Sequence, residues 1–97
     1  MSAAPGGLPA QEARLKRLRM RAWRRGTKEM DLILGPYADA RLAVMSPAEL
    51  DLFETILEEN DQDLYLWVTG KGTPPAEISG LLEAIAAHAR ARLSPHG

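Results

Sequence analysis

Apolar residues recur along most of this chain at the three- and four-residue spacing that places side chains on one face of an α-helix. Few β-branched residues occur, whereas Ala, Leu, Arg and Glu, which favour helices, are abundant. The sequence therefore predicts an all-α fold in a single domain. About five helices are expected, over residues 11–25, 27–44, 46–60, 61–68 and 73–93.

The helix boundaries are marked by capping residues. Ser46 is predicted to be an N-cap, with Pro47 at the first helical position and Glu49 closing a capping box. Gly26 is expected to end the first helix in the left-handed conformation, and Thr27 to cap the second. The third helix is predicted to bury a stripe of four apolar residues, Leu50, Phe53, Ile56 and Leu57.

Two segments depart from the simple helical pattern. Gly35 and Pro36 interrupt the second helix, and because Pro36 lacks an N–H group we expect a kink or a break there. Residues 64–68 also fit the alternation of a β-strand. A lone strand would have no partner in this chain, so we predict a short helix capped by Asp61.

Length and composition limit the possible functions. A chain of 97 residues forms one domain with a modest core and little room for an internal substrate cavity. The absence of cysteine excludes disulfides, thiolate metal sites and a thiol nucleophile. We expect a flexible segment at residues 1–10, a folded domain at 11–93 and a frayed tail at 94–97. No apolar run approaches the ~20 residues that span a bilayer, so no membrane insertion is expected.

Charge is distributed unevenly along the chain. Residues 1–29 hold eight basic and two acidic side chains, whereas residues 30–97 hold four basic and eleven acidic ones. Such asymmetry suits docking onto a protein of complementary charge, and it also occurs in nucleic-acid-binding proteins. The basic start is similar to a transit peptide, but it continues into the predicted fold, so we interpret it as mature protein.

The motifs of enzymes and metal sites are absent. Residues 69–73 lack the glycine and hydroxyl positions of a phosphate-binding loop, and His88 and His96 have no metal-ligand partners at short spacing. No Ser/His/Asp set can be assembled. The carboxylates between residues 58 and 63 are interpreted as a solvated face with capping roles. We predict no catalytic, cofactor-binding or metal-binding residue.

The remaining candidate is the sequence Arg25-Gly26-Thr27-Lys28-Glu29. In one interpretation, Gly26 ends a helix and Arg25 pairs with Glu29 across the turn, for about 0.2–0.5 kcal/mol. In the other, the bare glycine backbone lets a partner protein approach closely, between a guanidinium and a carboxylate that form directed hydrogen bonds.

A larger pattern surrounds this motif. Arg25-Gly26-x-x-Glu29 follows a basic helix and precedes Asp31, LDLFETILEE at residues 50–59 and DQDLYLW at residues 61–67. Over residues 14–93 the chain resembles the succinate dehydrogenase assembly factors that promote flavinylation, called SdhE in bacteria. By position, the resemblance implies that the partner-binding residues are Arg25, Gly26, Glu29, Asp31, Tyr65 and Trp67.

The resemblance also implies a compact helical bundle that binds the flavoprotein subunit of succinate dehydrogenase or fumarate reductase. Such a factor helps to attach FAD covalently to a histidine of that subunit. It is not itself an enzyme, holds no FAD stably and is expected to be a monomer when free. Its expected location is the bacterial cytoplasm, or the mitochondrial matrix in a eukaryote.

Two other function classes remain open from the residues. A small nucleic-acid-binding protein would use the basic first helix on phosphates, and its binding would weaken steeply with salt. A regulatory or antitoxin-like interaction module would use the same surface on a different protein. The acidic balance after residue 29 argues against nucleic acid.

Overall fold

The computed structural model describes residues 10–93. The predicted flexible segment and frayed tail lie outside these residues, apart from residue 10. The all-α prediction is confirmed, because the described residues form helices and turns with no strand. In chain order the elements are α1 (Ala10–Trp23), α2 (Lys28–Arg41), the 3₁₀ turn η1 (Leu42–Val44), α3 (Pro47–Leu57), α4 (Asp61–Val68) and α5 (Ala76–Leu93).

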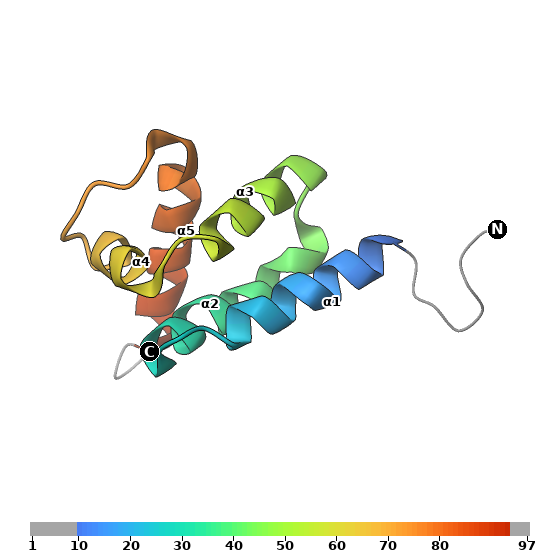
Figure 1. Ribbon diagram of the computed structural model, residues 1–97, viewed down its shortest axis with the longest axis horizontal. Helices are drawn as coiled ribbons and strands as arrows, with labels where there is room; N and C mark the ends of the chain where they lie inside the picture. Colours follow the sequence, from blue (N-terminus) through green and yellow to red (C-terminus); the bar gives the residue numbers. More distant parts are fainter. Residues whose placement is uncertain (1–9, 94–97) are drawn as a thin grey trace.

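The helices enclose one core (Figure 1). α1 and α2 run side by side in opposite directions, and α3 packs against α1 and α5. α5 also contacts α2 and α4, and α4 lies against α2. Fully buried core side chains come from all five helices and from η1; the largest are Leu18, Met30, Leu34, Leu42, Leu50, Phe53, Ile56, Leu64, Ile78 and Ile85.

The predicted stripe of α3 is confirmed, because Leu50, Phe53, Ile56 and Leu57 are all buried. Phe53 stacks on Tyr37 of α2, with ring centroids 6.3 Å apart. The rings of Tyr37 and His88 of α5 meet edge to face at 5.4 Å. These aromatic contacts join α2, α3 and α5 in the middle of the core.

The proline in α2 does not break the helix, because α2 continues through Gly35 and Pro36 to its last turn. Gly35 is buried under the indole ring of Trp23, and a β-carbon at this position would overlap ring atoms. The Trp23 indole N–H also donates to the Asp39 carboxylate at 3.2 Å. Close packing against α1 therefore supports the segment where a helical hydrogen bond is lost.

Two predicted caps are present. Ser46 and Glu49 form the expected capping box, in which the Glu49 N–H donates to Ser46 Oγ at 3.1 Å and the Ser46 N–H donates to Glu49 Oε1 at 2.8 Å. Thr27 caps α2 by accepting from the Met30 N–H at 3.3 Å. Local sequence therefore determines where α2 and α3 begin.

Two other terminal predictions were wrong. The N-cap of α4 is Asn60, which accepts from the Asp63 N–H at 2.8 Å, whereas Asp61 is the first helical residue. Within the described residues only Gly70 has a positive φ, so Gly26 does not take the left-handed conformation. The Asp61 carboxylate does not cap α4. It accepts hydrogen bonds from the backbone N–H groups of Gly26 and Thr27.

The packing of α2 predicts opposite effects for the same substitution at two helical glycines. Gly35→Ala should destabilise the protein by about 1–3 kcal/mol, because the new methyl group meets the Trp23 ring. Gly80→Ala in α5 should stabilise it by about 0.4–1 kcal/mol, because no atom lies within 4 Å of the new β-carbon. Urea unfolding of both variants measures the difference. Equal stabilisation by both would contradict the packing of Trp23 on Gly35.

Candidate functional site

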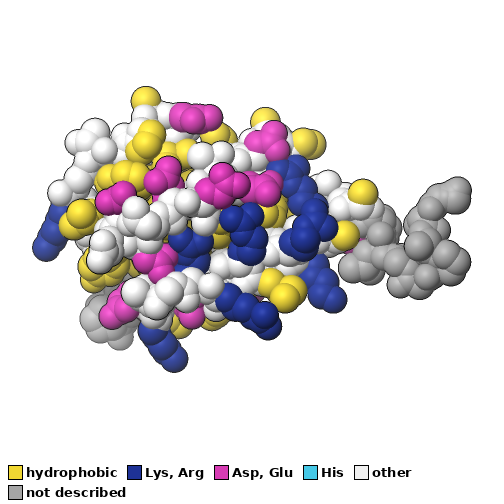
Figure 2. All heavy atoms as spheres, viewed as in Figure 1, with side chains coloured by type: hydrophobic (Ala, Val, Ile, Leu, Met, Phe, Trp, Pro, Cys, Tyr) yellow, Lys and Arg dark blue, Asp and Glu magenta, His cyan; other side chains and the backbone are white. Residues whose placement is uncertain are grey.

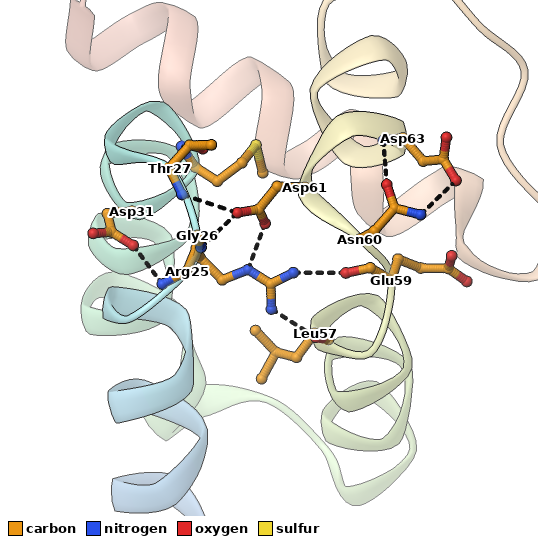
Figure 3. A network of polar contacts seen from close by, with 10 residues as sticks. Arg25, Gly26, Thr27, Asp31, Leu57, Glu59, Asn60, Asp61 and Asp63 are labelled. Carbon is orange, nitrogen blue, oxygen red and sulfur yellow. Dashed lines mark hydrogen bonds and ion pairs between the residues drawn. The ribbon is translucent and has the colours of Figure 1, made fainter.

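The α1–α2 junction lies beside the α3–α4 junction, and a network of polar contacts joins them (Figure 3). The Arg25 side chain extends from the first junction to the second. Its exposed fraction is only 10%. The guanidinium therefore acts within the protein and not on its surface.

The Arg25 guanidinium satisfies three acceptors of the α3–α4 region. Its Nε donates to Asp61 Oδ1 at 2.8 Å, and its two Nη atoms donate to the carbonyls of Leu57 and Glu59, each at 2.6 Å. Leu57 is the last residue of α3, where backbone carbonyls lack helical partners and carry partial negative charge. A guanidinium in this position caps the C-terminal end of α3 while it pairs with Asp61.

The Asp61 carboxylate is the centre of the network. Besides the Arg25 guanidinium, it accepts from the N–H groups of Gly26 at 2.6 Å and Thr27 at 3.0 Å. Only 12% of its side chain is exposed. Its place in the first turn of α4 also favours a negative charge. The interpretation of the residue 58–63 carboxylates as a solvated face is therefore wrong for Asp61.

The approach of Asp61 leaves little room for a side chain at residue 26. A β-carbon at residue 26 would lie 3.1 Å from Asp61 Oδ2, an oxygen that two backbone N–H groups already hold. The Asp61 side chain of the same chain makes this close approach to the backbone, and Gly26 itself is exposed, so approach by a partner protein stays a prediction. Asp31 completes the junction by accepting from the Arg25 N–H at 2.6 Å. Three successive N–H groups thus point at carboxylates.

Glu29 has a different environment from Arg25. It is exposed in the first turn of α2, and the Arg25–Glu29 pair that one interpretation predicted is not among the ion pairs of residues 10–93. Two shallow grooves meet at Glu29, and Tyr65 of α4 lines both. Large apolar side chains beside them are unusually exposed: Leu32 at 38%, Tyr65 at 45% and Leu66 at 44%. We call Glu29, Leu32, Tyr65 and Leu66 the Glu29 surface.

Trp67 lies apart from this surface. Its partly buried ring packs against the core and faces the loop around Gly72, where a β-carbon would lie 3.2 Å from it. Of the six residues predicted for partner binding, the structure brings Arg25, Gly26 and Asp31 into the network. It places Glu29 and Tyr65 on the surface beside it.

Asp61 is the site residue that sequence reasoning missed. It is 36 residues from Arg25, so no helical spacing connects the two. The available signal was its position at the start of the DQDLYLW segment that carries the family resemblance.

Many basic side chains of α1 are paired within the protein. In Figure 2 the Lys and Arg side chains gather over α1, and the Asp and Glu side chains of α3 meet them. Arg14 binds Asp51 at 2.6 Å and Glu54 at 3.1 Å, and Arg21 lies 3.6 Å from Glu54. The hydrogen bond that Arg14 donates to Asp51, more than the one that it donates to Glu54, raises the pKa of Arg14 above its ordinary value. The charge asymmetry of the sequence is partly neutralised in the fold.

Two kinds of site are absent from residues 10–93. In this part of the chain no three acidic or histidine side chains are grouped so that they could hold a metal ion. None of its helices is both long enough and apolar enough to cross a membrane. A carboxylate and a phenol among exposed apolar side chains are typical of protein–protein contacts.

Comparison of the sequence with known protein families identifies the family of this chain. A family model described as "Flavinator of succinate dehydrogenase" matches residues 16–89, which is more than half of the chain. The chain belongs to this flavinator family. The matched residues include the whole Arg25 network and the Glu29 surface.

Named relatives of this flavinator family member occur in bacteria and fungi. The FAD assembly factor SdhE of Vibrio cholerae is 33% identical over 79 residues, covering 80% of this chain and 87% of the relative. SdhE of Acetobacter pasteurianus is 40% identical, covering 67% and 60%. The mitochondrial succinate dehydrogenase assembly factor 2 of Mycosarcoma maydis is 39% identical over 69% of this chain. This chain spans only 28% of that fungal protein.

The network predicts a large difference between two nearby aspartates. Asp61→Ala should cost about 3–5 kcal/mol of unfolding free energy, because it leaves a largely buried guanidinium and two N–H groups without their acceptor. Asp63→Ala should cost less than about 1 kcal/mol, because in the described residues the Asp63 carboxylate accepts a hydrogen bond only from the side-chain amide of Asn60. Urea unfolding measures both values. Equal costs would show that Asp61 does not hold the junctions together.

Proposed function

We propose that this chain binds the flavoprotein subunit of succinate dehydrogenase or fumarate reductase and promotes covalent attachment of FAD to it. The observation that carries the proposal is the Glu29 surface, where a carboxylate without an ion-pair partner in residues 10–93 stands among exposed apolar side chains. Membership of the flavinator family supports the choice of partner. The printed names of the bacterial relatives, FAD assembly factors, support the attachment of FAD as the outcome.

In this proposal the factor supplies binding energy and no catalytic group. FAD and the acceptor histidine would both belong to the partner. When the histidine nitrogen bonds the C8 methyl carbon of the isoalloxazine, one C–H bond of that methyl group and the imidazole N–H bond would break, and the flavin ring would take up the two electrons and two protons. The factor favours the partner conformation in which the histidine faces that carbon. Holding two groups in reacting geometry accelerates a reaction by replacing an encounter with a pre-oriented contact. We therefore propose a non-enzymatic assembly factor that holds no FAD of its own.

The two parts of the Arg25-Gly26-x-x-Glu29 motif have separate roles in the proposal. Arg25 and Gly26 bond to Asp61 and so position the first turn of α2 against α4. Glu29 and Tyr65, one on each helix, contact the partner. Loss of Arg25 or Gly26 would then impair docking indirectly, through the geometry of the surface, and it would also destabilise the fold.

The same structure weakens the nucleic-acid alternative. Arg14, Arg19 and Arg21 of α1 each lie within ion-pair distance of a carboxylate of this chain. These side chains are less available for phosphate contacts, which supply most non-specific affinity for nucleic acid. A regulatory module with another partner would not promote flavinylation of the subunit. A flavinylation assay therefore separates that alternative from our proposal.

The compartment and oligomeric state follow from the proposal. The factor meets its partner where the flavoprotein subunit folds, which is the cytoplasm in a bacterium and the matrix in a mitochondrion. The names of the fungal relatives include the word mitochondrial. We propose a free monomer, because the Glu29 surface is then open for the flavoprotein.

The proposal predicts that Glu29→Gln separates function from stability. Glu29 is exposed, so its replacement should change the unfolding free energy by no more than about 0.5 kcal/mol. Covalent flavinylation of the purified apo-flavoprotein subunit, followed as FAD fluorescence on a denaturing gel, should slow by about tenfold or more, as expected when a hydrogen-bonded charge is lost from an interface.

Glu83→Gln is the matched control, because Glu83 is an exposed glutamate on α5 outside the two grooves at Glu29. It should leave flavinylation unchanged. Equal rates for the two variants would remove Glu29 from the interface. If the wild-type protein fails to bind or flavinylate the subunit, the proposed function is wrong.

A further inference from the structure

A groove extends from the Glu29 surface across to α5. Its volume is about 580 Å³, and it lies between α2, α4 and α5. Apart from Glu29, Thr69 and Arg90, its lining is mostly apolar: Leu32, Ile33, Tyr65, Val68, Ala86 and Ala89. The small side chains of α5 create the hollow, because alanine leaves space that a larger residue would fill.

The rim of this groove carries opposite charges. Glu29 stands on the α2 side and Arg90 on the α5 side. Both are exposed, and within residues 10–93 neither forms an ion pair. A groove with an apolar floor and two free charges of opposite sign can fix both the position and the direction of what binds in it.

We infer that this groove, with Arg90 as a specificity residue, holds a protruding segment of the flavoprotein subunit. That segment carries an apolar side chain between a basic residue that faces Glu29 and an acidic residue that faces Arg90. The inference rests on the proposed function and extends it, because it names the chemistry of the partner segment and adds α5 to the interface.

Three observations favour a partner segment over a second copy of this chain. The surface is concave, and two concave faces placed against one another leave a void, so a second copy would have to bring a projecting segment of its own into the groove. The groove is continuous with the Glu29 surface, since Glu29 and Tyr65 line both grooves. Its charges are separated by an apolar floor, which matches an extended or helical segment with its own charges flanking an apolar anchor.

The first experiment reverses the charge of Arg90. Affinity for the purified apo-flavoprotein subunit is measured by titration calorimetry for the wild type, Arg90→Glu and Arg90→Gln. We expect Kd to rise at least about tenfold for Arg90→Glu, with a smaller rise for Arg90→Gln, because reversal adds repulsion to the loss of attraction. Circular dichroism melting of each variant separates a folding defect from a binding defect.

Lys71→Glu is the matched control. Lys71 is an exposed basic residue of the α4–α5 loop outside this groove, and its reversal changes the net charge by the same amount. Its Kd should stay within about twofold of the wild type, because Lys71 does not line the groove and an exposed charge is screened by salt. If Lys71→Glu weakens binding as much as Arg90→Glu, only the overall charge matters and the inference is overturned.

A second experiment identifies the occupant of the groove. Thr69, exposed in its lining, is replaced by the photo-crosslinking residue benzoylphenylalanine, and the crosslinked peptides are sequenced by mass spectrometry. We expect a flavoprotein peptide that carries an apolar residue between a basic and an acidic one. A crosslink only to a second copy of this chain, or to a peptide without these charges, overturns the inference.

The outcomes also separate the two proposals. If the wild type forms the complex and Arg90→Glu binds equally well, the groove inference fails while the proposed function stands. If the wild type forms no complex with the flavoprotein subunit, both fail together.

Discussion

The ion pair between Arg25 and Asp61 joins the α1–α2 junction to the α3–α4 junction. Both side chains are about nine-tenths buried, at 10% and 12% exposure, so their charges lose most of their hydration. A buried pair is favourable only when further hydrogen bonds offset that loss. Here Arg25 also donates to two carbonyls at the end of α3, and Asp61 accepts from two backbone N–H groups before α2.

This network determines the geometry of the surface beside it. Glu29 is on the first turn of α2 and Tyr65 on α4, and Asp61 at the start of α4 bonds directly to the residues that precede α2. The distance between Glu29 and Tyr65 therefore depends on the hydrogen bonds of Asp61, in which neither residue takes part. Such preorganisation reduces the ordering that a docking surface must undergo when it binds. In the Arg25-Gly26-x-x-Glu29 motif, Arg25 and Gly26 thus hold the two junctions together, and Glu29 forms no ion pair within residues 10–93.

The chemistry of the chain fits this division. Three of the five basic side chains of α1 lie within ion-pair distance of carboxylates on α2 and α3. The exposed apolar side chains Leu32, Tyr65 and Leu66 then stand out on the side that carries Glu29. The adjoining groove to α5 widens this surface and supplies Arg90 as a charge of the opposite sign. In the proposed function, the protein acts through the shape and charge that it presents, and the reaction takes place on its partner.

Sequence by itself determined the local features of this protein. Helical spacing predicted the all-α fold and the buried stripe of α3, and the Ser46–Glu49 capping box placed its start, because these contacts join residues three or four positions apart. The family resemblance pointed to the segments that form the Arg25 network and the Glu29 surface. Only the tertiary structure decided that Arg25 pairs with Asp61, 36 residues away, and that Gly35 packs under Trp23. The periodicity of a sequence does not predict such contacts, because they depend on how separate helices meet. Gly26 was therefore predicted to lie at a helix junction, but its close contact with Asp61 was not.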